Sequence, residues 1–250
     1  MSPAELALVF TLGIVIGGIG GLLGLGGGLI AIPLLGLAFG MSQQLAQGTA
    51  MVMIVGNTFL GLWRNHRLGN VEAKYAVTMA ASAALFTWLT ALVALRMESA
   101  SLRFAFGVFV CVLALYTIWS NLAPGRAAAG ARVLPWGWSS VVGAAGGALS
   151  GLFGVGAGIF APPALTALFG MRQAAAQAHT LALAAPVTIV GLFTYAAHGQ
   201  ANLEFGIALA LGGLCSVSYG VRLAHRLPEK TLRLLFSALL ALVGVVLVAR

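Results

Sequence analysis

Two glutamines, Gln47 and Gln177, are the polar side chains of this sequence best placed to do chemistry. Each lies inside an apolar stretch, the two are 130 residues apart, and each is followed within three residues by a threonine, Thr49 or Thr180. A glutamine in an apolar membrane stretch must find partners, so it either crosslinks helices or faces a polar cavity. The recurrence favours the cavity, where these groups would hydrogen-bond a small polar solute.

One histidine belongs to the same set. His179 aligns with Thr49 under the 130-residue shift and is the only histidine well inside an apolar stretch. An imidazole there could carry a proton or, when charged, donate to an anion; a hydrogen-bonded packing histidine is the alternative. We interpret Asn57 as a residue that hydrogen-bonds one helix to another. We interpret Arg64 and Arg67 as residues that extend their charged ends to the membrane surface and set the orientation of the chain.

Dense glycines precede both polar stretches. Glycine tolerates positive φ and lowers helix propensity, so a helix should break at 24–28 and again at 154–158. A short apolar run follows each break, at 28–39 and 158–169, and its N-terminal N–H groups would point into the gap. Because no acidic residue is nearby, this is the outline of an anion site. The glycines concerned are Gly26, Gly27 and Gly28, with Gly156 and Gly158.

Earlier glycines are spaced differently. Those spaced by four residues allow helices to pack closely in a membrane, and we interpret them as packing residues. They are Gly13, Gly17 and Gly21, with Gly143, Gly147 and Gly151.

The chain is a duplication. Residues 13–62 align with 143–192 without a gap, and 19 of the 50 pairs are identical, including punctuating pairs such as Pro33 and Pro163. Such identity at glycine and proline positions indicates two copies of one unit. We therefore divide the chain into a first repeat at 1–121, a linker at 122–135 and a second repeat at 136–250.

Composition decides the class of protein. With 60% hydrophobic and 7% charged residues and a mean hydropathy of +1.03, the chain has too few polar side chains to form the surface of a soluble globular protein. A spanning helix needs about 20 apolar residues. We expect an all-α integral membrane protein of two tandem repeats, each of about four full spans or five segments, with broken helices at the glycine motifs. The expected full spans are 5–23, 45–63, 74–95, 103–120, 137–153, 175–197, 204–224 and 231–249.

Charge sets orientation and partners. Junction 64–74 holds three Lys or Arg residues and its counterpart 197–204 holds none, so corresponding loops should face opposite sides, which favours inverted repeats with an odd number of membrane segments each. The alternative is a re-entrant hairpin at the glycine break, which would make the repeats parallel. The net charge of +8 is spread over the junctions, which indicates contact with the lipid bilayer and not with nucleic acid. The N-terminus lacks a cleavable signal, so the first helix would act as the insertion signal.

Enzyme motifs are missing from the sequence. It contains no P-loop, GxSxG or HExxH motif and no paired intramembrane aspartates, and Cys111 and Cys215 lack metal-ligand spacing. We expect neither an enzyme nor a cofactor or metal site.

Three motifs carry a resemblance to a known family. They are GGLLGLGGG at 20–28, Pro-Leu-Leu at 33–35 and Ala-Gln-Gly-Thr at 46–49, and together they resemble the sulfite exporter TauE/SafE family over nearly the whole chain. The resemblance implies a multi-pass secondary transporter of the bacterial inner membrane that moves sulfite, sulfonates or related small anions. Ala157, where the first repeat has a glycine, and His179 depart from a symmetric pattern.

Two hypotheses follow. The first is an exporter of small inorganic or organosulfur anions that works by alternating access around a midplane site between the repeats, driven by a proton or anion gradient. The alternative is a membrane scaffold whose glycines serve packing alone. Both leave a homo-oligomer open. The expected substrate-binding residues are Gly26, Gly27, Gly28, Gln47, Thr49, Gly156, Gly158, Gln177, His179 and Thr180.

Overall fold

The computed structural model describes residues 2–24, 26–67, 72–122, 134–155, 157–158, 160–171 and 173–248. These residues form ten α-helices and one short 3-10 helix, and no strand is found among them. The elements are α1 (Pro3–Leu23), α2 (Gly28–Phe39), α3 (Gln43–Arg67), α4 (Ala73–Ala94), α5 (Ser99–Leu122), η1 (Trp136–Trp138), α6 (Ser139–Phe153), α7 (Ala161–Phe169), α8 (Gln173–Ala197), α9 (Leu203–Arg226) and α10 (Glu229–Val248).

Six helices are long and apolar enough to cross a membrane: α1, α4, α5, α8, α9 and α10. Two helices that we expected to be full spans differ from these. The helix α3 has 25 residues but includes several amides and charged residues. The helix α6 has 15 residues, about 22 Å of helix, because Gly154 ends it in the left-handed conformation.

The two short helices lie where the glycine motifs predict them. The helix α2 has the predicted bounds and 12 residues. The helix α7 begins at Ala161, three residues later than predicted, and has nine residues. Its first turn holds Pro162 and Pro163, which lack N–H groups that would in any case have no partner inside the helix.

Glycines bring α1 against α9 and α6 against α4. At six of them a Cβ atom would overlap the backbone of the partner helix, so only glycine permits the observed approach. In the first pair Gly13, Gly17 and Gly21 face Leu209, Gly213 and Val217; in the second Gly143, Gly147 and Gly151 face Met79, Ala83 and Thr87. The three glycines of α6 lie 130 positions after those of α1, and their partners on α4 lie 130 positions before the partners on α9. The same contact is therefore made twice, with the two halves of the chain exchanged.

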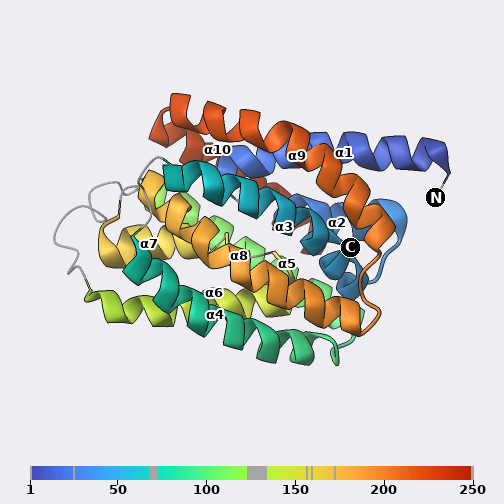
Figure 1. The fold of residues 1–250 in the computed structure, drawn as a ribbon, viewed down its shortest axis with the longest axis horizontal. Helices are drawn as coiled ribbons and strands as arrows, with labels where there is room; N and C mark the ends of the chain where they lie inside the picture. The colour runs from blue at the N-terminus through green and yellow to red at the C-terminus, as the bar shows by residue number, and fades with distance from the viewer. Residues whose placement is uncertain are drawn as a thin grey trace.

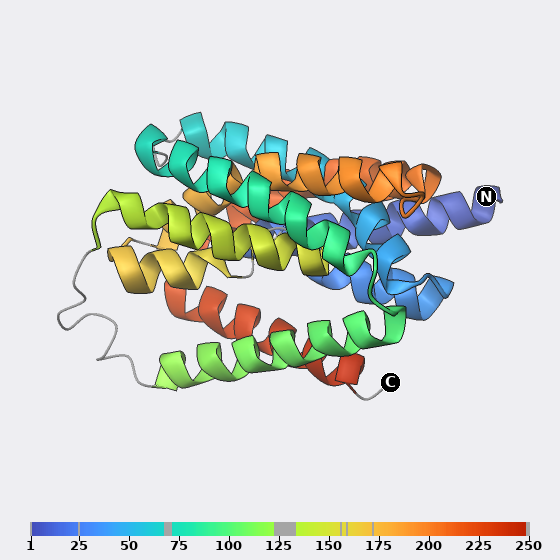
Figure 2. The same cartoon turned by 90° about the horizontal axis from the view of Figure 1, so that it is seen from below.

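Helices of the two repeats are interleaved. The most extensive pairings are α1 with α9, α4 with α6, α5 with α10, and α3 with α8, and each joins one repeat to the other. Figures 1 and 2 show the result, with α5 and α10 together along one side of the bundle. The helices of the predicted repeats, 1–121 and 136–250, thus share one packed bundle.

The helices α3 and α8 cross the middle of the bundle in opposite directions (Figure 1). Met51, early in α3, packs against Gly191, late in α8. Most of the buried polar side chains lie on these two helices: Gln43, Gln44, Gln47, Thr49, Asn57, Thr58, His179, Thr180, Thr188 and Thr194. The pair therefore forms a polar centre inside an apolar shell.

Candidate functional site

Left-handed glycines occur at both breaks, three of them at the first and, among the described residues, one at the second. Gly24 (φ 71°) ends α1, Gly26 (φ 66°) and Gly27 (φ 96°) lead into α2, and Gly154 (φ 73°) ends α6. A residue with a Cβ would be strained at each of them. The helix α2 starts at Gly28 without a side-chain cap, so its N-terminal end is turned toward the break unscreened by any side-chain acceptor.

The two breaks meet in space. Gly28 lies against Val155, because a Cβ at Gly28 would sit 3.2 Å from the Cα of Val155. Asn57 of α3 lies at the first break, where its Nδ2 donates to the Gly26 carbonyl at 3.2 Å. Asn57 was expected to hydrogen-bond another helix, but its acceptor Gly26 lies in the break between α1 and α2 and in neither helix. Gly158 is buried in the second break, and Gly156 lies outside the described residues.

Each glutamine packs on the break of the other repeat. Gln47 lies against Gly154, where an added Cβ would be 2.7 Å from its Cβ and Cγ. Gln177 lies against Gly24, where an added Cβ would be 3.4 Å from the Cγ of Gln177. The two contacts are related by the 130-residue shift, so the glutamines and breaks form one crossed arrangement.

The two glutamines differ in their hydrogen bonds. Gln47 is fully buried; its Oε1 accepts from Tyr195 Oη at 2.7 Å and its Nε2 donates to the Leu152 carbonyl at 3.3 Å. Gln177 is half-buried, and its amide makes no hydrogen bond to a residue that the structure describes. The amide of Gln177 is therefore the one available to a solute.

Tyr195 is a residue that the sequence reasoning missed. Its ring is fully buried, and its hydroxyl lies 2.7 Å from Gln47 Oε1 and 2.9 Å from the Gly151 carbonyl. One hydroxyl proton can serve one of these acceptors at a time. The signal was present in the sequence, since a tyrosine inside an apolar span must find a partner for its hydroxyl.

Thr49 and His179 hold the starts of two helices. The hydroxyl of Thr49 accepts from the backbone N–H of Asn202 at 2.9 Å, and Asn202 is the N-cap of α9. His179 Nε2 accepts from the backbone N–H of Glu72 at 3.0 Å, and Glu72 is the N-cap of α4. Positions 72 and 202 are themselves 130 residues apart, so Thr49 and His179 make equivalent hydrogen bonds, each to the N-cap residue of a helix.

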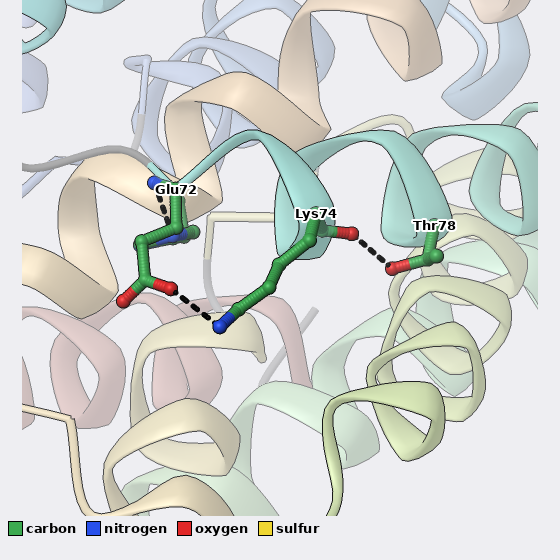
Figure 3. A network of polar contacts seen from close by, with 4 residues as sticks. Glu72, Lys74 and Thr78 are labelled. Atoms are coloured by element: carbon green, nitrogen blue, oxygen red, sulfur yellow. Dashed lines mark hydrogen bonds and ion pairs between the residues drawn. The ribbon is translucent and has the colours of Figure 1, made fainter.

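Both ring nitrogens of His179 are engaged by the protein. Its Nε2 accepts the Glu72 N–H, which places the ring proton on Nδ1, and Nδ1 donates to the Ala175 carbonyl at 2.8 Å. Figure 3 shows the start of α4, where Glu72 also forms an ion pair with Lys74 at 3.1 Å. Thr180 is likewise satisfied, since its hydroxyl donates to the Ala176 carbonyl of its own helix at 2.7 Å.

Neither a metal site nor a charged cluster accompanies the breaks. Within the part of the chain that the structure describes, no group of three His, Cys, Asp or Glu residues is arranged to hold a metal ion. The first break offers the N-terminus of α2 and the amide of Gln177 as donors. At the second break the Ala161 N–H already donates to the Ala157 carbonyl, and Pro162 and Pro163 have no N–H. Asn57 Oδ1, at the first break, is a buried acceptor without a hydrogen bond to any described residue. The donors of the first break suit a small anion.

Comparison with known proteins covers almost the entire chain. The sequence model of the family described as "Sulfite exporter TauE/SafE" matches residues 9–247. The chain is similar to a probable membrane transporter protein of Methanocaldococcus jannaschii, at 24% identity over 96% of this chain and 94% of the relative. A relative in Xylella fastidiosa, also a probable membrane transporter protein, is 28% identical over 83% of this chain and 80% of its own length. Another, YunE of Bacillus subtilis, is 23% identical over 95% of both chains. No solved structure matches.

Proposed function

Because this chain belongs to the sulfite exporter TauE/SafE family and is a multi-pass membrane transporter, we propose that it exports small sulfur oxyanions, such as sulfite or sulfonates, across the inner membrane. The family description supports the substrate class. The chemistry of the first break supports it independently, since the N-terminus of α2 and the amide of Gln177 are donors there, and no acidic residue is near either break in the sequence.

The crossed contacts of the glutamines with the breaks carry this proposal. The anion binds where the breaks meet, against the backbone of Gly26 to Gly28 and of Gly156 and Gly158, and Gln177 donates to it from α8. Gln47 completes the opposite wall and is held in place by Tyr195. Thr49 and His179 position the helices around the site through the hydrogen bonds described above. Thr180 bonds only within its own helix, and we assign none of the three a contact with the anion.

Alternating access must then move units that contain helices of both repeats. Since α1 packs on α9 and α4 packs on α6, a rocking motion of residues 1–121 against 136–250 would break both glycine-lined interfaces. The moving bodies are instead mixed, for example α1 with α9 against α4 with α6. The antiparallel course of α3 and α8 supports an inverted repeat with the site on its pseudo-two-fold axis. A proton or anion gradient drives the cycle.

Transport by purified protein in liposomes tests the proposal. Wild-type protein should release trapped sulfite or a short sulfonate, and Gln177→Met should slow this release at least tenfold with little change in thermal stability, because Gln177 has no hydrogen bond to lose. Adding Gln47→Leu should abolish release.

Gln44→Met is the matched control. Gln44 also lies on α3, but its Nε2 donates to the Met97 carbonyl at 2.7 Å, away from the breaks. We expect this variant to be less stable and still active. Wild-type flux in the double variant would refute the site, and the absence of flux for every sulfur oxyanion with wild-type protein would favour the scaffold alternative.

A further inference from the structure

A second donor-lined cleft lies at the opposite end of α2 from the breaks. It has a volume of about 10 Å³ and is lined by the C-terminal half of α2, Met41, Gln43 at the start of α3, Arg103 of α5, and Leu247 of α10. The helix α10 contacts α2, and its Leu247 closes this side of the cleft. Pro33, the lining residue nearest the first break, lies five residues after Gly28, so about 8 Å of helix separates this cleft from the break.

Two donors in the cleft have no partner. Gln43 is 4% exposed, and its Nε2 is buried without a hydrogen bond. Arg103 is half-buried and makes no hydrogen bond or ion pair with any residue that the structure describes. A buried donor without an acceptor is unfavourable, and native structures leave few of them. An acceptor that is also negatively charged would satisfy both groups at once.

The donors are fixed in place before any ligand binds. The backbone N–H of Gln43 donates to Ser99 Oγ at 2.7 Å, and Ser99 is the first residue of the helix that carries Arg103. Gln44, the next residue, donates to the Met97 carbonyl in the connection before that helix. The starts of α3 and α5 are thus tied together, which keeps Gln43 and Arg103 on the same cleft.

Capping of α2 does not account for Arg103. The last turn of α2 is closed by the backbone N–H groups of Gly40 and Met41, which both donate to the Leu35 carbonyl. Arg103 donates to none of the described carbonyls there. The residue types also recur in the second repeat, where Pro163, Met171, Gln173 and Arg233 follow Pro33, Met41, Gln43 and Arg103 by 130 positions.

We propose that Gln43 and Arg103 form an oxyanion site at the C-terminal end of α2, separate from the site at the breaks. A cleft of this volume holds one water-sized group. It therefore accepts a single terminal oxygen of a phosphate, sulfate or sulfonate group, while the remainder of the ion stays in the open mouth beside Leu247. The chemistry is shared by two sources, a free oxyanion and the phosphate of a lipid headgroup.

Thermal unfolding in detergent tests this site without transport. One arm titrates sodium sulfate against sodium chloride at matched ionic strength, and the other adds phosphatidylglycerol against phosphatidylcholine. We expect at least one arm to raise the Tm of the wild-type protein. Arg103→Gln and Gln43→Glu should each weaken the apparent affinity at least tenfold, because one removes the positive charge and the other places a carboxylate against the ligand.

Two controls separate this site from general charge effects and from the breaks. Arg96→Gln removes an exposed arginine from the connection before α5 and should keep the wild-type response. Gln177→Met removes any sulfate response that comes from the breaks, and the response that remains should be the part that Arg103→Gln weakens. Arg103→Lys keeps the charge and should retain part of the affinity, which guards against a variant that fails to fold. A response to sulfate identifies a free anion and a response to lipid alone identifies a headgroup. No response in either arm, or an unchanged response in both Arg103→Gln and Gln43→Glu, overturns the proposal.

Discussion

Replacing Thr49 by valine separates the two roles that its position allows. Thr49 is fully buried, and its hydroxyl accepts the backbone N–H of Asn202 at 2.9 Å, where α9 begins. Valine has nearly the same shape and no acceptor. The change therefore opens no cavity and removes one hydrogen bond, which leaves the Asn202 N–H without its partner.

The expected loss of stability follows from that one bond. A buried donor left unsatisfied costs about 1 to 3 kcal/mol. Asn202 is only half-buried, so water reaches it in part, and we expect the lower portion of that range, about 1 to 2 kcal/mol. The helix α9 should still form, because the side chain of Asn202 itself caps it by accepting from the Phe205 N–H at 3.2 Å.

The assay pairs stability with transport. Thermal unfolding in detergent should show a Tm about 2 to 8 °C lower for Thr49→Val, using about 2 to 4 °C per kcal/mol for a chain of this size, and wild-type behaviour for Thr49→Ser, which keeps the acceptor. Transport per folded protein should be unchanged in both. A Thr49→Val protein with wild-type stability and no transport would show that the hydroxyl contacts the anion, and would refute the positioning role.

Three further results are expected. Tyr195→Phe should cost about 1 to 2 kcal/mol and slow transport, because Gln47 Oε1 loses its donor; an unchanged unfolding curve would contradict the role of Tyr195. Gly154→Ala and Gly24→Ala should each cost about 1 to 2 kcal/mol, because alanine is strained at positive φ. Gly154→Ala should be the more destabilising by at least 1 kcal/mol, because its Cβ would lie 2.7 Å from Gln47, whereas the Cβ of Gly24→Ala would lie 3.4 Å from Gln177. Equal losses of stability would argue against the close contact between Gly154 and Gln47. Lys74→Met should leave the melting curve unchanged, since both partners of its ion pair with Glu72 are more than half exposed, and a shift in the melting curve would mean that Lys74 has another role.

Local features of the fold were predictable because they depend on neighbouring residues. Apolar stretches and glycine motifs predicted the bounds of α2, and those of most long helices to within a few residues. The start of α7 was missed because two prolines lie in its first turn and because residues 157, 158 and 160 form turns before it. Glycine spacing does not reveal where the first intrahelical hydrogen bond forms.

Partners far along the chain were not predictable. Glycines at four-residue spacing indicate close packing but not which helix approaches, so the pairing of α1 with α9 came only with the structure. For the same reason Thr49 and His179 looked like substrate ligands in the sequence. Their partners are backbone N–H groups at positions 202 and 72, and backbone groups leave no trace in a pattern of side chains.

The interleaving of the repeats has a consequence for how the chain is made. The helix α1 leaves the ribosome first, but α9, which covers its glycine face, ends about 200 residues later. At about 5 to 20 residues per second, that is a wait of roughly 10 to 40 s. During this time Gly13, Gly17 and Gly21 face lipid or the insertion machinery. Arrest of synthesis before α9 should therefore leave α1 inserted but unassembled and open to proteases or to a wrong partner, so the protein becomes a stable transporter only when nearly all of it has been translated.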